Sequence, residues 1–323
     1  MGARIGPYEL IAELGSGGMA RLFLARQSGP GGFSRRVAIK VIHPEIASDP
    51  EIVKMFLDEA RLGGAIRHPN VAQVEAIDEH EGAPYLVMEY IEGATLMQVL
   101  RARSQRRDPL PIELAVAIVA RVAEGLHAAH ETTDELGRPL GIVHRDVSPS
   151  NVLIDTAGHV KLIDFGVAKA RHRLAKTTPG SVKGKLAYMA PEQLAGQDAD
   201  RRVDVFALGV VLWEALTLRR LFAGASDLDT ILKIRDPAPV IPPSSIRPEV
   251  PPRLDDVVGT MLSRDLEERF CTAAAARHAM LLSCPEASSL EASAIAPLAQ
   301  EQPGLQTVDD VTVPARLAAK RAP

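Results

Sequence analysis

Short apolar runs separated by glycine-rich turns fill the first part of the chain. Three runs, at residues 8–14, 20–26 and 36–42, are separated by turns at 15–18 and 29–32. Two further strand-like runs follow at 71–78 and 83–91. Between them, apolar positions recur at helical spacing over 50–66, and Ser48 with Glu51 fits a capping box before that helix. The pattern predicts a small antiparallel sheet accompanied by one helix.

The apolar periods lengthen after residue 94. Residues 112–130 and 203–217 each predict a long, mostly buried helix, and short strand-like pieces lie at 151–155 and 161–166. We therefore expect a strand-rich domain over 1–93 and a larger helical domain over 94–283. Residues 284–323 are rich in Ala, Ser, Pro and Gln. That composition predicts a low-complexity, disordered tail.

Charge and cysteine content narrow the class of protein. The chain of 323 residues carries 37 Lys and Arg against 41 Asp and Glu, a net charge of -4. This balance argues against a nucleic-acid partner, which usually requires a basic surface. Two cysteines are too few for a disulfide framework. No apolar window is long enough for a signal peptide or a membrane span, so we expect a cytoplasmic protein.

The glycine-rich turn at 15–18 is the first candidate for chemistry. Gly15, Gly17 and Gly18 would allow backbone N–H groups to approach a phosphate closely. A dinucleotide-binding fingerprint has similar spacing but must open a helix, whereas a strand-like run follows here. Without further motifs, an ordinary glycine turn would explain the segment equally well.

Five charged or polar residues farther along change that interpretation. Lys40 lies in an otherwise apolar strand, and Glu59 lies on the inward face of the 50–66 helix, where it could hold the lysine ammonium. Asp146, Asn151 and Asp164 follow in the runs HRDVSPSN and IDFG. They offer one proton acceptor and two oxygen ligands suited to a hard cation such as Mg²⁺. Together with the glycine turn, their joint occurrence in this order is not expected by accident.

These motifs, over residues 8–280, resemble those of eukaryotic-type (Hanks-type) serine/threonine protein kinases of bacteria. The resemblance implies an α+β, bilobal protein-kinase fold, with a small antiparallel-sheet N-lobe containing one helix and a larger helical C-lobe. It implies ATP and Mg²⁺ as ligands in a cleft between the lobes. Asp146 would accept the substrate hydroxyl proton, and Asn151 and Asp164 would bind the metal. Lys40, paired with Glu59, would bind the α- and β-phosphates.

The resemblance also assigns positions that would contact the nucleotide. The 15–18 turn would cover the phosphates, apolar side chains would enclose the adenine with Met88 as gatekeeper, and the backbone of 89–91 would bind the adenine edge. These positions are Leu14, Gly15, Ser16, Gly17, Gly18, Leu22, Ala38, Met88, Glu89, Ile91 and Leu153.

The chain departs from the family pattern beside the catalytic aspartate. The family usually has a lysine two residues after that aspartate, where this chain has Ser148, and a threonine where it has Lys185. We interpret the two departures as an exchange, in which the Lys185 ammonium contacts Asp146 and meets the γ-phosphate. The alternative is a solvent-exposed Lys185 and damaged activity. Gly63 and an extra polar segment at 131–141 also depart from the pattern.

The resemblance makes further predictions about scaffolding and regulation. Glu192 should pair with Arg269, while Asp204 and Gly209 should anchor the catalytic loop from a buried helix. Thr177, Thr178 and Ser181, in a basic loop, are candidate phosphorylation sites. In the tail, Thr307 is followed three residues later by Asp310. This spacing makes Thr307 a candidate ligand of an FHA-type phosphothreonine reader.

The sequence leaves several functions open. The leading hypothesis is a protein kinase that transfers the ATP γ-phosphate to Ser or Thr hydroxyls of proteins, including its own. A nucleotide-binding pseudokinase scaffold is the alternative, supported by Ser148, Lys185 and Gly63. A small-molecule phosphotransferase is disfavoured by the peptide-docking run 189–192, MAPE. Tyrosine specificity is not excluded, because the lysine typical of Ser/Thr kinases is missing.

Overall fold

A computed structural model describes residues 3–165, 185–236 and 238–300. These residues group into two compact units. Unit 1 contains residues 3–65 and 72–91, and unit 2 contains residues 66–71 and 92–300. The division after Ile91 lies two residues before the boundary predicted at 93/94.

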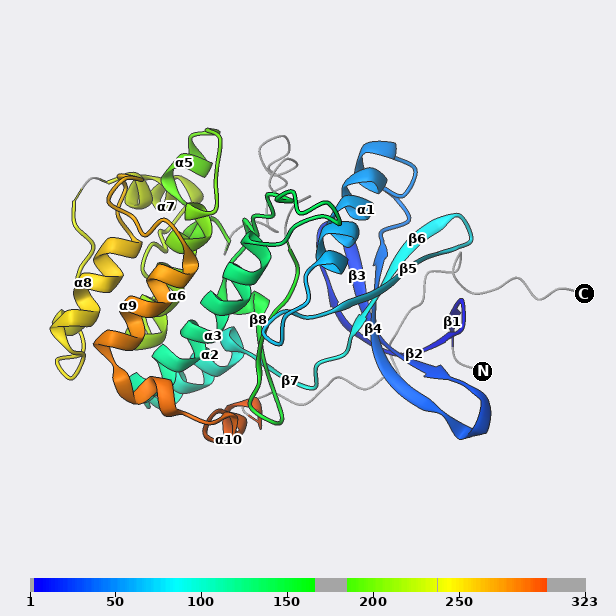
Figure 1. The fold of residues 1–323 in the computed structure, drawn as a ribbon, viewed down its shortest axis with the longest axis horizontal. Coiled ribbons are helices and arrows are strands. Elements are labelled where there is room, and N and C mark those ends of the chain that lie inside the picture. The colour runs from blue at the N-terminus through cyan, green and yellow to red at the C-terminus, as the bar shows by residue number, and fades with distance from the viewer. Residues whose placement is uncertain (1–2, 166–184, 237, 301–323) are drawn as a thin grey trace, which may run out of the picture. The chain divides into compact units, whose positions relative to one another are not determined.

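Unit 1 is an antiparallel sheet with one long helix (Figure 1). The sheet has the strand order β1-β2-β3-β4-β6-β5, and helix α1 packs on β5 and β6. The elements are β1 (Arg4–Ile5), β2 (Tyr8–Ser16), β3 (Ala20–Ser28), η1 (Pro30–Gly32), β4 (Ser34–Ile42), α1 (Pro50–Ala65), β5 (Val74–His80) and β6 (Ala83–Glu89). Every predicted strand and the predicted helix of this part are present within a few residues of their expected bounds.

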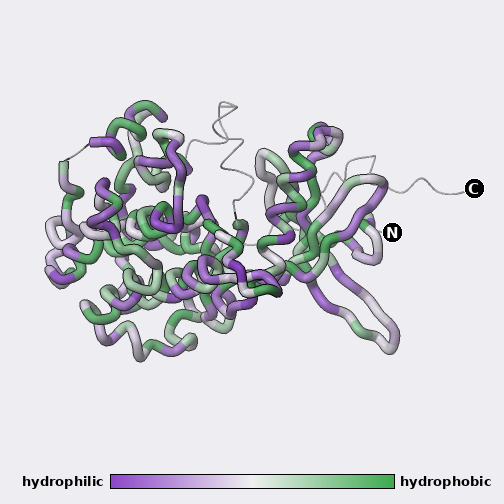
Figure 2. The backbone as a smooth tube through the Cα atoms, turned by 45° about the horizontal axis from the view of Figure 1, so that its top comes forward, coloured by the Kyte–Doolittle hydropathy of each residue, from purple (hydrophilic) through white to green (hydrophobic). Residues whose placement is uncertain are grey.

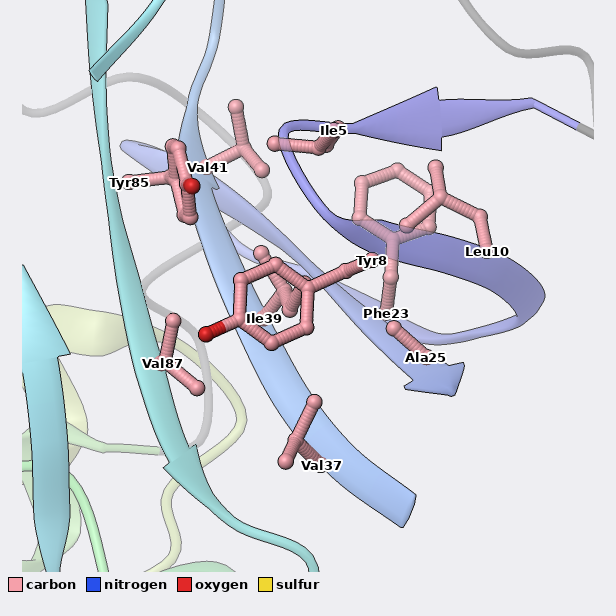
Figure 3. Close-up of a cluster of buried hydrophobic side chains, with 10 residues drawn as sticks. All are labelled: Ile5, Tyr8, Leu10, Phe23, Ala25, Val37, Ile39, Val41, Tyr85 and Val87. Atoms are coloured by element: carbon pink, nitrogen blue, oxygen red, sulfur yellow. The ribbon is translucent and has the colours of Figure 1, made fainter. Parts of the chain in front are cut away.

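Two apolar clusters stabilise unit 1, one on each face of the sheet. The cluster in Figure 3 gathers residues of β1, β2, β3, β4 and β6, with Phe23, Ile39 and Tyr85 fully buried. Tyr8 meets Tyr85 edge to face, with ring centroids 6.2 Å apart. The second cluster includes Phe56 of α1 and holds that helix on the sheet. The strand alternation thus buries both faces, because a helix covers one of them.

Unit 2 is mainly helical, with a small three-stranded sheet of order β7-β8-β9 (Figure 1). Helix α6 is buried from its second residue to its last, and α3 packs against α6 and α9. The elements are β7 (Gly93–Thr95), α2 (Leu96–Arg106), α3 (Ile112–His130), η2 (Pro149–Asn151), β8 (Val152–Asp155), β9 (Val160–Leu162), η3 (Leu186–Tyr188), α5 (Pro191–Leu194), α6 (Arg202–Thr217), α7 (Asp227–Arg235), η4 (Pro243–Ser245), α8 (Pro252–Met261), α9 (Ala273–Ser283), η5 (Pro285–Ser289), α10 (Ala292–Ile295) and η6 (Ala296–Gln300). Both predicted long helices are confirmed.

The predicted disorder from residue 284 onward is wrong for residues 284–300. This stretch forms η5, α10 and η6, and it packs against α3, β7 and β8. Ile295 and Leu298 are at most 1 % exposed, so a few large apolar residues suffice to fix a segment that is otherwise rich in Ala, Ser and Pro. Residues 301–323 lie outside the described residues.

Two smaller expectations also need correction. Residues 66–71 belong to unit 2, because Asn70 O accepts from Leu162 N at 2.8 Å and Asn70 Nδ2 donates to Val160 O at 2.8 Å. Helix α1 is capped by Asp49, whose Oδ1 accepts from the backbone N–H of Glu51. The predicted capping residue was Ser48.

The extra segment at 131–141 folds into a hydrogen-bonded turn. Asp134 Oδ1 accepts from the backbone N–H groups of Leu136 and Arg138, and Arg138 Nε donates to Asp134 Oδ2. The backbone and side-chain hydrogen bonds from Arg138 hold the pKa of Asp134 below its usual value. The turn leaves Leu136 76 % exposed.

Hydrophilic and hydrophobic positions are interleaved along both units (Figure 2). Within the described part of the chain, no helix combines the length and the apolar character that crossing a bilayer requires.

Candidate active site

The predicted lysine–glutamate pair is formed in unit 1. Lys40 lies on β4, where its backbone is paired with Leu22 on one side and Leu86 on the other. Its Nζ donates to Glu59 Oε1 of α1 at 2.6 Å. Both side chains are more than nine-tenths buried. The sheet and the helix therefore hold an ammonium group in a fixed position within a largely apolar environment.

The predicted phosphate-binding turn joins β2 to β3. No atom of the described residues lies within 4 Å of the place where a Cβ would stand on Gly15 or Gly18, and at Gly17 the nearest is Ala20 O at 3.7 Å. None of the three glycines has a positive φ. Neither packing nor backbone conformation requires glycine there. Space beside the backbone is what the close approach of a phosphate needs.

A histidine that the sequence reasoning missed fixes this turn. His43 Nε2 donates to Gly17 O at 2.6 Å, and the His43 backbone N–H donates to Met19 O at 3.0 Å. Ser16 is paired with Arg21 across the hairpin. The signal in the sequence was a polar residue directly after the apolar run of β4, which is too common a feature to be recognised.

The apolar residues predicted around the adenine lie in one cluster of unit 1. Ala38 and Met88 are buried members, while Leu14 and Leu22 are partly buried and pack against them. Ala38 and Met88 are also directly paired across β4 and β6. The structure therefore brings these four predicted side chains together, and two of them remain partly exposed.

The remaining predicted nucleotide contacts lie at the end of unit 1 and in unit 2. The Glu89 backbone N–H donates to Gln73 O at 2.9 Å, so this N–H is already committed within unit 1. Ile91 is the last residue of unit 1. Leu153 of β8 is partly exposed, while its neighbours Val152 and Ile154 are fully buried, so it faces away from the core of unit 2.

Three of the predicted catalytic residues meet in unit 2. Asp146 Oδ2 accepts from Asn151 Nδ2 at 3.0 Å and from Lys185 Nζ at 2.6 Å. Asn151 Nδ2 also donates to the Asp146 carbonyl at 2.7 Å. The Asp146 side chain is 4 % exposed and that of Lys185 is 30 % exposed. The predicted contact between Lys185 and Asp146 is present.

Asp164 is brought beside this group by the backbone of the preceding residue. Ile163 N donates to Asn151 O at 2.9 Å, and His144 Nε2 donates to Ile163 O at 3.1 Å. The rings of His144 and Phe165 lie 4.7 Å apart. Asp164 itself has a φ of 58°, a conformation that costs a non-glycine residue about 1–3 kcal/mol and is concentrated at functional sites.

The loop that carries Asp146 is anchored by a buried carboxylate of α6. Asp204, which is fully buried, accepts from the backbone N–H groups of His144 at 2.8 Å and Arg145 at 2.7 Å. It also accepts from His130 Nε2 at 2.8 Å. These bonds hold Arg145 at a φ of 62°. The predicted anchoring by Asp204 is confirmed.

Gly209, which is predicted to share that task, packs against the end of α8. A Cβ on this residue would lie 2.8 Å from the Cβ of Met261 and 3.1 Å from Leu262. Glycine therefore allows α6 and the end of α8 to approach closely.

Gly63 on α1 also has a local packing reason. A Cβ there would lie 3.1 Å from Val74 Cγ2, so the missing side chain lets the helix approach β5. The residue is buried.

The predicted scaffold pair is confirmed. Arg269 donates to both carboxylate oxygens of Glu192, at 2.7 and 3.2 Å, and its side chain is 0 % exposed. Two carbonyls, those of Ser263 and Arg202, complete its hydrogen bonds. The predicted phosphorylation sites Thr177, Thr178 and Ser181, and Thr307, lie outside the described residues.

The donor set suits a hard divalent cation. The amide nitrogen of Asn151 is committed to Asp146, so its Oδ1 is the group it presents as an acceptor. Asp164 directly follows Ile163, whose backbone N–H donates to Asn151 O. A carbonyl and a carboxylate oxygen are the ligands that Mg²⁺ prefers. Among the described residues there is no group of three or more His, Cys, Asp or Glu that could hold a metal. The two oxygens would therefore bind a metal together with substrate phosphates.

Comparison with known proteins agrees with this geometry. The chain is 44 % identical over 270 residues to tyrosine-protein kinase MasK of Myxococcus xanthus, and 36 % identical over 271 residues to serine/threonine-protein kinase PknA of Mycobacterium tuberculosis. The alignments cover 84 % and 82 % of this chain but 42 % and 58 % of those relatives. The crystal structure of the M. tuberculosis PknI kinase domain matches with a TM-score of 0.64 at 27 % identity, covering 88 % of this chain and 98 % of that one.

The same comparison confirms the predicted fold, with a curled antiparallel sheet in one lobe and helices in the other. The protein kinase domain family matches residues 8–281. The chain belongs to the protein kinase domain family, among bacterial serine/threonine kinase homologues.

Proposed function

We propose that this chain is an active protein kinase that transfers the γ-phosphoryl group of ATP to hydroxyl groups of proteins, itself included. The observation that carries the proposal is the buried Asp146 carboxylate, oriented by Asn151 at 3.0 Å. Phosphoryl transfer needs little covalent chemistry from the enzyme and depends on positioning and charge neutralisation. Both requirements are supplied by side chains that unit 1 and unit 2 fix separately.

The residues of each unit take distinct roles. In unit 1, Lys40, held by Glu59, binds ATP phosphates. The Gly15–Gly18 turn covers them, although the Gly17 N–H is already donated to Ala20 O at 2.9 Å. In unit 2, Asp146 positions the substrate hydroxyl and accepts its proton. The substrate oxygen forms a bond to the γ-phosphorus, the bond from that phosphorus to the bridging oxygen breaks, and ADP leaves with the electron pair.

Mg²⁺ is the metal that the donor set fits, and it would neutralise charge on the phosphates when bound. Asn151 and Asp164 are the residues that would hold it. Their orientation depends on hydrogen bonds within unit 2, from Asn151 Nδ2 to Asp146 and from Ile163 N to Asn151 O. A substitution that disturbs either bond should therefore weaken metal-dependent nucleotide binding.

Serine and threonine are the proposed acceptors. Several relatives, such as PknA, are named serine/threonine kinases, and the catalytic loop lacks the usual replacement of tyrosine kinases. Tyrosine is the second candidate because MasK, at 44 % identity, is named a tyrosine-protein kinase. Phosphoamino-acid analysis of the labelled product decides between them.

The experiment that tests the function is incubation of the purified chain with labelled ATP, Mg²⁺ and a generic basic protein. We expect label in both the protein substrate and the chain itself, and none with Asp146→Asn. Equal labelling by the wild type and Asp146→Asn, or no labelling by either with Mg²⁺ or Mn²⁺, would contradict the proposal and favour a nucleotide-binding scaffold.

A further inference from the structure

The position of Lys185 next to the catalytic carboxylate is not explained by the roles above. Its Nζ lies 2.6 Å from Asp146 Oδ2. The carboxylate is 4 % exposed, whereas the lysine side chain is 30 % exposed. The lysine therefore contacts the base through its ammonium group, and its side chain as a whole remains partly exposed.

The backbone at Lys185 is anchored to the buried helix α6. Lys185 O accepts from Tyr188 N at 3.2 Å within η3, and the Tyr188 hydroxyl donates to Glu214 Oε2 at 2.7 Å. Glu214 accepts in turn from Arg220 Nε at 2.9 Å. Burial, with the nearby Glu214 charge, raises the pKa of the Tyr188 hydroxyl above its usual value, so this hydroxyl stays protonated as a donor.

We propose that Lys185 is a catalytic residue that binds the transferring phosphoryl group. It would replace the lysine that the kinase resemblance places at position 148. The proposal rests on the proposed kinase function. An acceptor hydroxyl that gives its proton to Asp146 must lie within about 2.6–3.2 Å of the carboxylate. A cation 2.6 Å from Oδ2 then lies no more than about 6 Å from an attacking oxygen that is held by this same carboxylate oxygen.

That distance suits a lysine, whose flexible stem carries a compact charge with three donors. In the transition state, negative charge is spread over the equatorial oxygens of the phosphoryl group, between the attacking and leaving oxygens. A donor aimed at those oxygens lowers the barrier without taking part in bond making. The proton still passes to Asp146, and Lys185 stays protonated throughout.

The residue at position 148 has no such group to offer. Ser148 is 1 % exposed, and its Oγ has no hydrogen-bond partner among the described residues. Ser148 Oγ therefore makes no hydrogen bond to Lys185 in the described structure. What the structure retains is the cation beside Asp146, supplied from the segment that precedes η3.

The competing explanation is that Lys185 only orients the Asp146 carboxylate and does not contact the phosphoryl group. Kinetics with two lysine variants begin to separate the two explanations. We expect Lys185→Ala to lower kcat about 10²–10³-fold, the usual cost of losing one transition-state donor, with the KM for ATP changed less than threefold. Lys233→Ala is the matched control, because that lysine is exposed on α7 and, among the described residues, its Nζ donates to Ala223 O at 2.7 Å. Its kcat should stay within twofold of the wild type.

The decisive readout uses binding rather than turnover. Calorimetry with ADP and Mg²⁺, with and without tetrafluoroaluminate, compares a ligand lacking the phosphoryl mimic with one containing it. The wild type and Lys233→Ala should bind ADP more tightly when tetrafluoroaluminate is present. In Lys185→Ala, the increase in ADP affinity caused by tetrafluoroaluminate should be at least tenfold smaller than in the wild type. Its affinity for ADP alone should stay within twofold of the wild-type value.

The outcomes are distinguishable from failure of the kinase function itself. An inactive wild type that does not bind ADP contradicts the proposed function. An active wild type with Lys185→Ala within threefold of its kcat overturns the role of Lys185 alone. The role of Lys185 is also overturned if tetrafluoroaluminate increases the ADP affinity of Lys185→Ala as much as that of the wild type. That result would mean that Lys185 orients Asp146 without contacting the phosphoryl group. Recovery of at least tenfold in kcat by Ser148→Lys/Lys185→Thr over Lys185→Thr supports the proposed role.

Discussion

The buried ion pair between Glu192 and Arg269 provides a test of the fold that does not depend on activity. Arg269→Met removes the guanidinium that contacts both carboxylate oxygens of Glu192, at 2.7 and 3.2 Å. The side chains of Glu192 and Arg269 are 5 % and 0 % exposed, so water cannot replace the hydrogen bonds that the guanidinium donates. Arg269 also donates to the carbonyls of Ser263 and Arg202, which lose those donors as well.

The magnitude follows from this burial. Breaking a buried ion pair by removing one partner costs about 3–5 kcal/mol, because the remaining charge is left without compensation. For a protein of this size, 1 kcal/mol corresponds to roughly 2–4 °C in Tm. We therefore expect Arg269→Met to lower the free energy of unfolding in urea by about 4 kcal/mol and the Tm by about 10 °C.

A matched control uses an exposed ion pair nearby. Arg277 of α9 lies 3.3 Å from Glu124, and both side chains are about two-fifths exposed. Arg277→Met should cost less than about 1 kcal/mol. The double variant Glu192→Leu/Arg269→Met should be more stable than Arg269→Met alone. A loss from Arg269→Met no larger than that of the control would refute the reasoning.

Three further predictions concern other parts of the chain. Gly158→Ala places a Cβ 1.8 Å from Ala292 O at a φ of +90°, so hydrogen exchange should show residues 284–300 losing protection; unchanged protection would contradict their packing. Asp134 has a lowered pKa because Arg138 donates to it, so the 131–141 turn is intact at neutral pH and is lost as the pH falls through that pKa. In a ¹³C carboxyl titration, Arg138→Ala should raise the midpoint, and an unmoved midpoint would refute this cause. Lys40→Met should weaken ATP binding about tenfold to a hundredfold, as expected for a hydrogen bond to a charged group; unaltered affinity by calorimetry would show that this ammonium does not contact the phosphates.

Periodicity predicted the long elements because each has a strong, local apolar pattern. Helix α6 is apolar on nearly every face and is buried along its length, and α3 matches its predicted bounds of 112–130. The prediction for residues 284–300 was wrong because their burial depends on contacts with α3 and β7. Local composition does not encode such contacts. The predicted capping residue of α1 was wrong because two adjacent residues, Ser48 and Asp49, are both of types that cap helices well.

The site was predictable where motifs carry it. Lys40 and Glu59 meet as expected, and so do Asp146 and Lys185, although 39 residues separate the second pair in the sequence. What the sequence could not show is how these groups are supported. His43 under the glycine turn and the hydrogen bond between Tyr188 and Glu214 connect residues through the fold. Neither forms a recognisable motif.

The most direct test of the central claim is single-turnover phosphoryl transfer from saturating ATP and Mg²⁺ to a protein acceptor, comparing the wild type with Asp146→Asn. Asp146 is only 6 % exposed, and asparagine has nearly the same shape. The substitution should therefore preserve the fold and the affinity for ADP. We expect equal nucleotide affinity and a rate of transfer reduced at least about 10²-fold, the lower range for loss of a general base. Equal rates for the two proteins would contradict the claim.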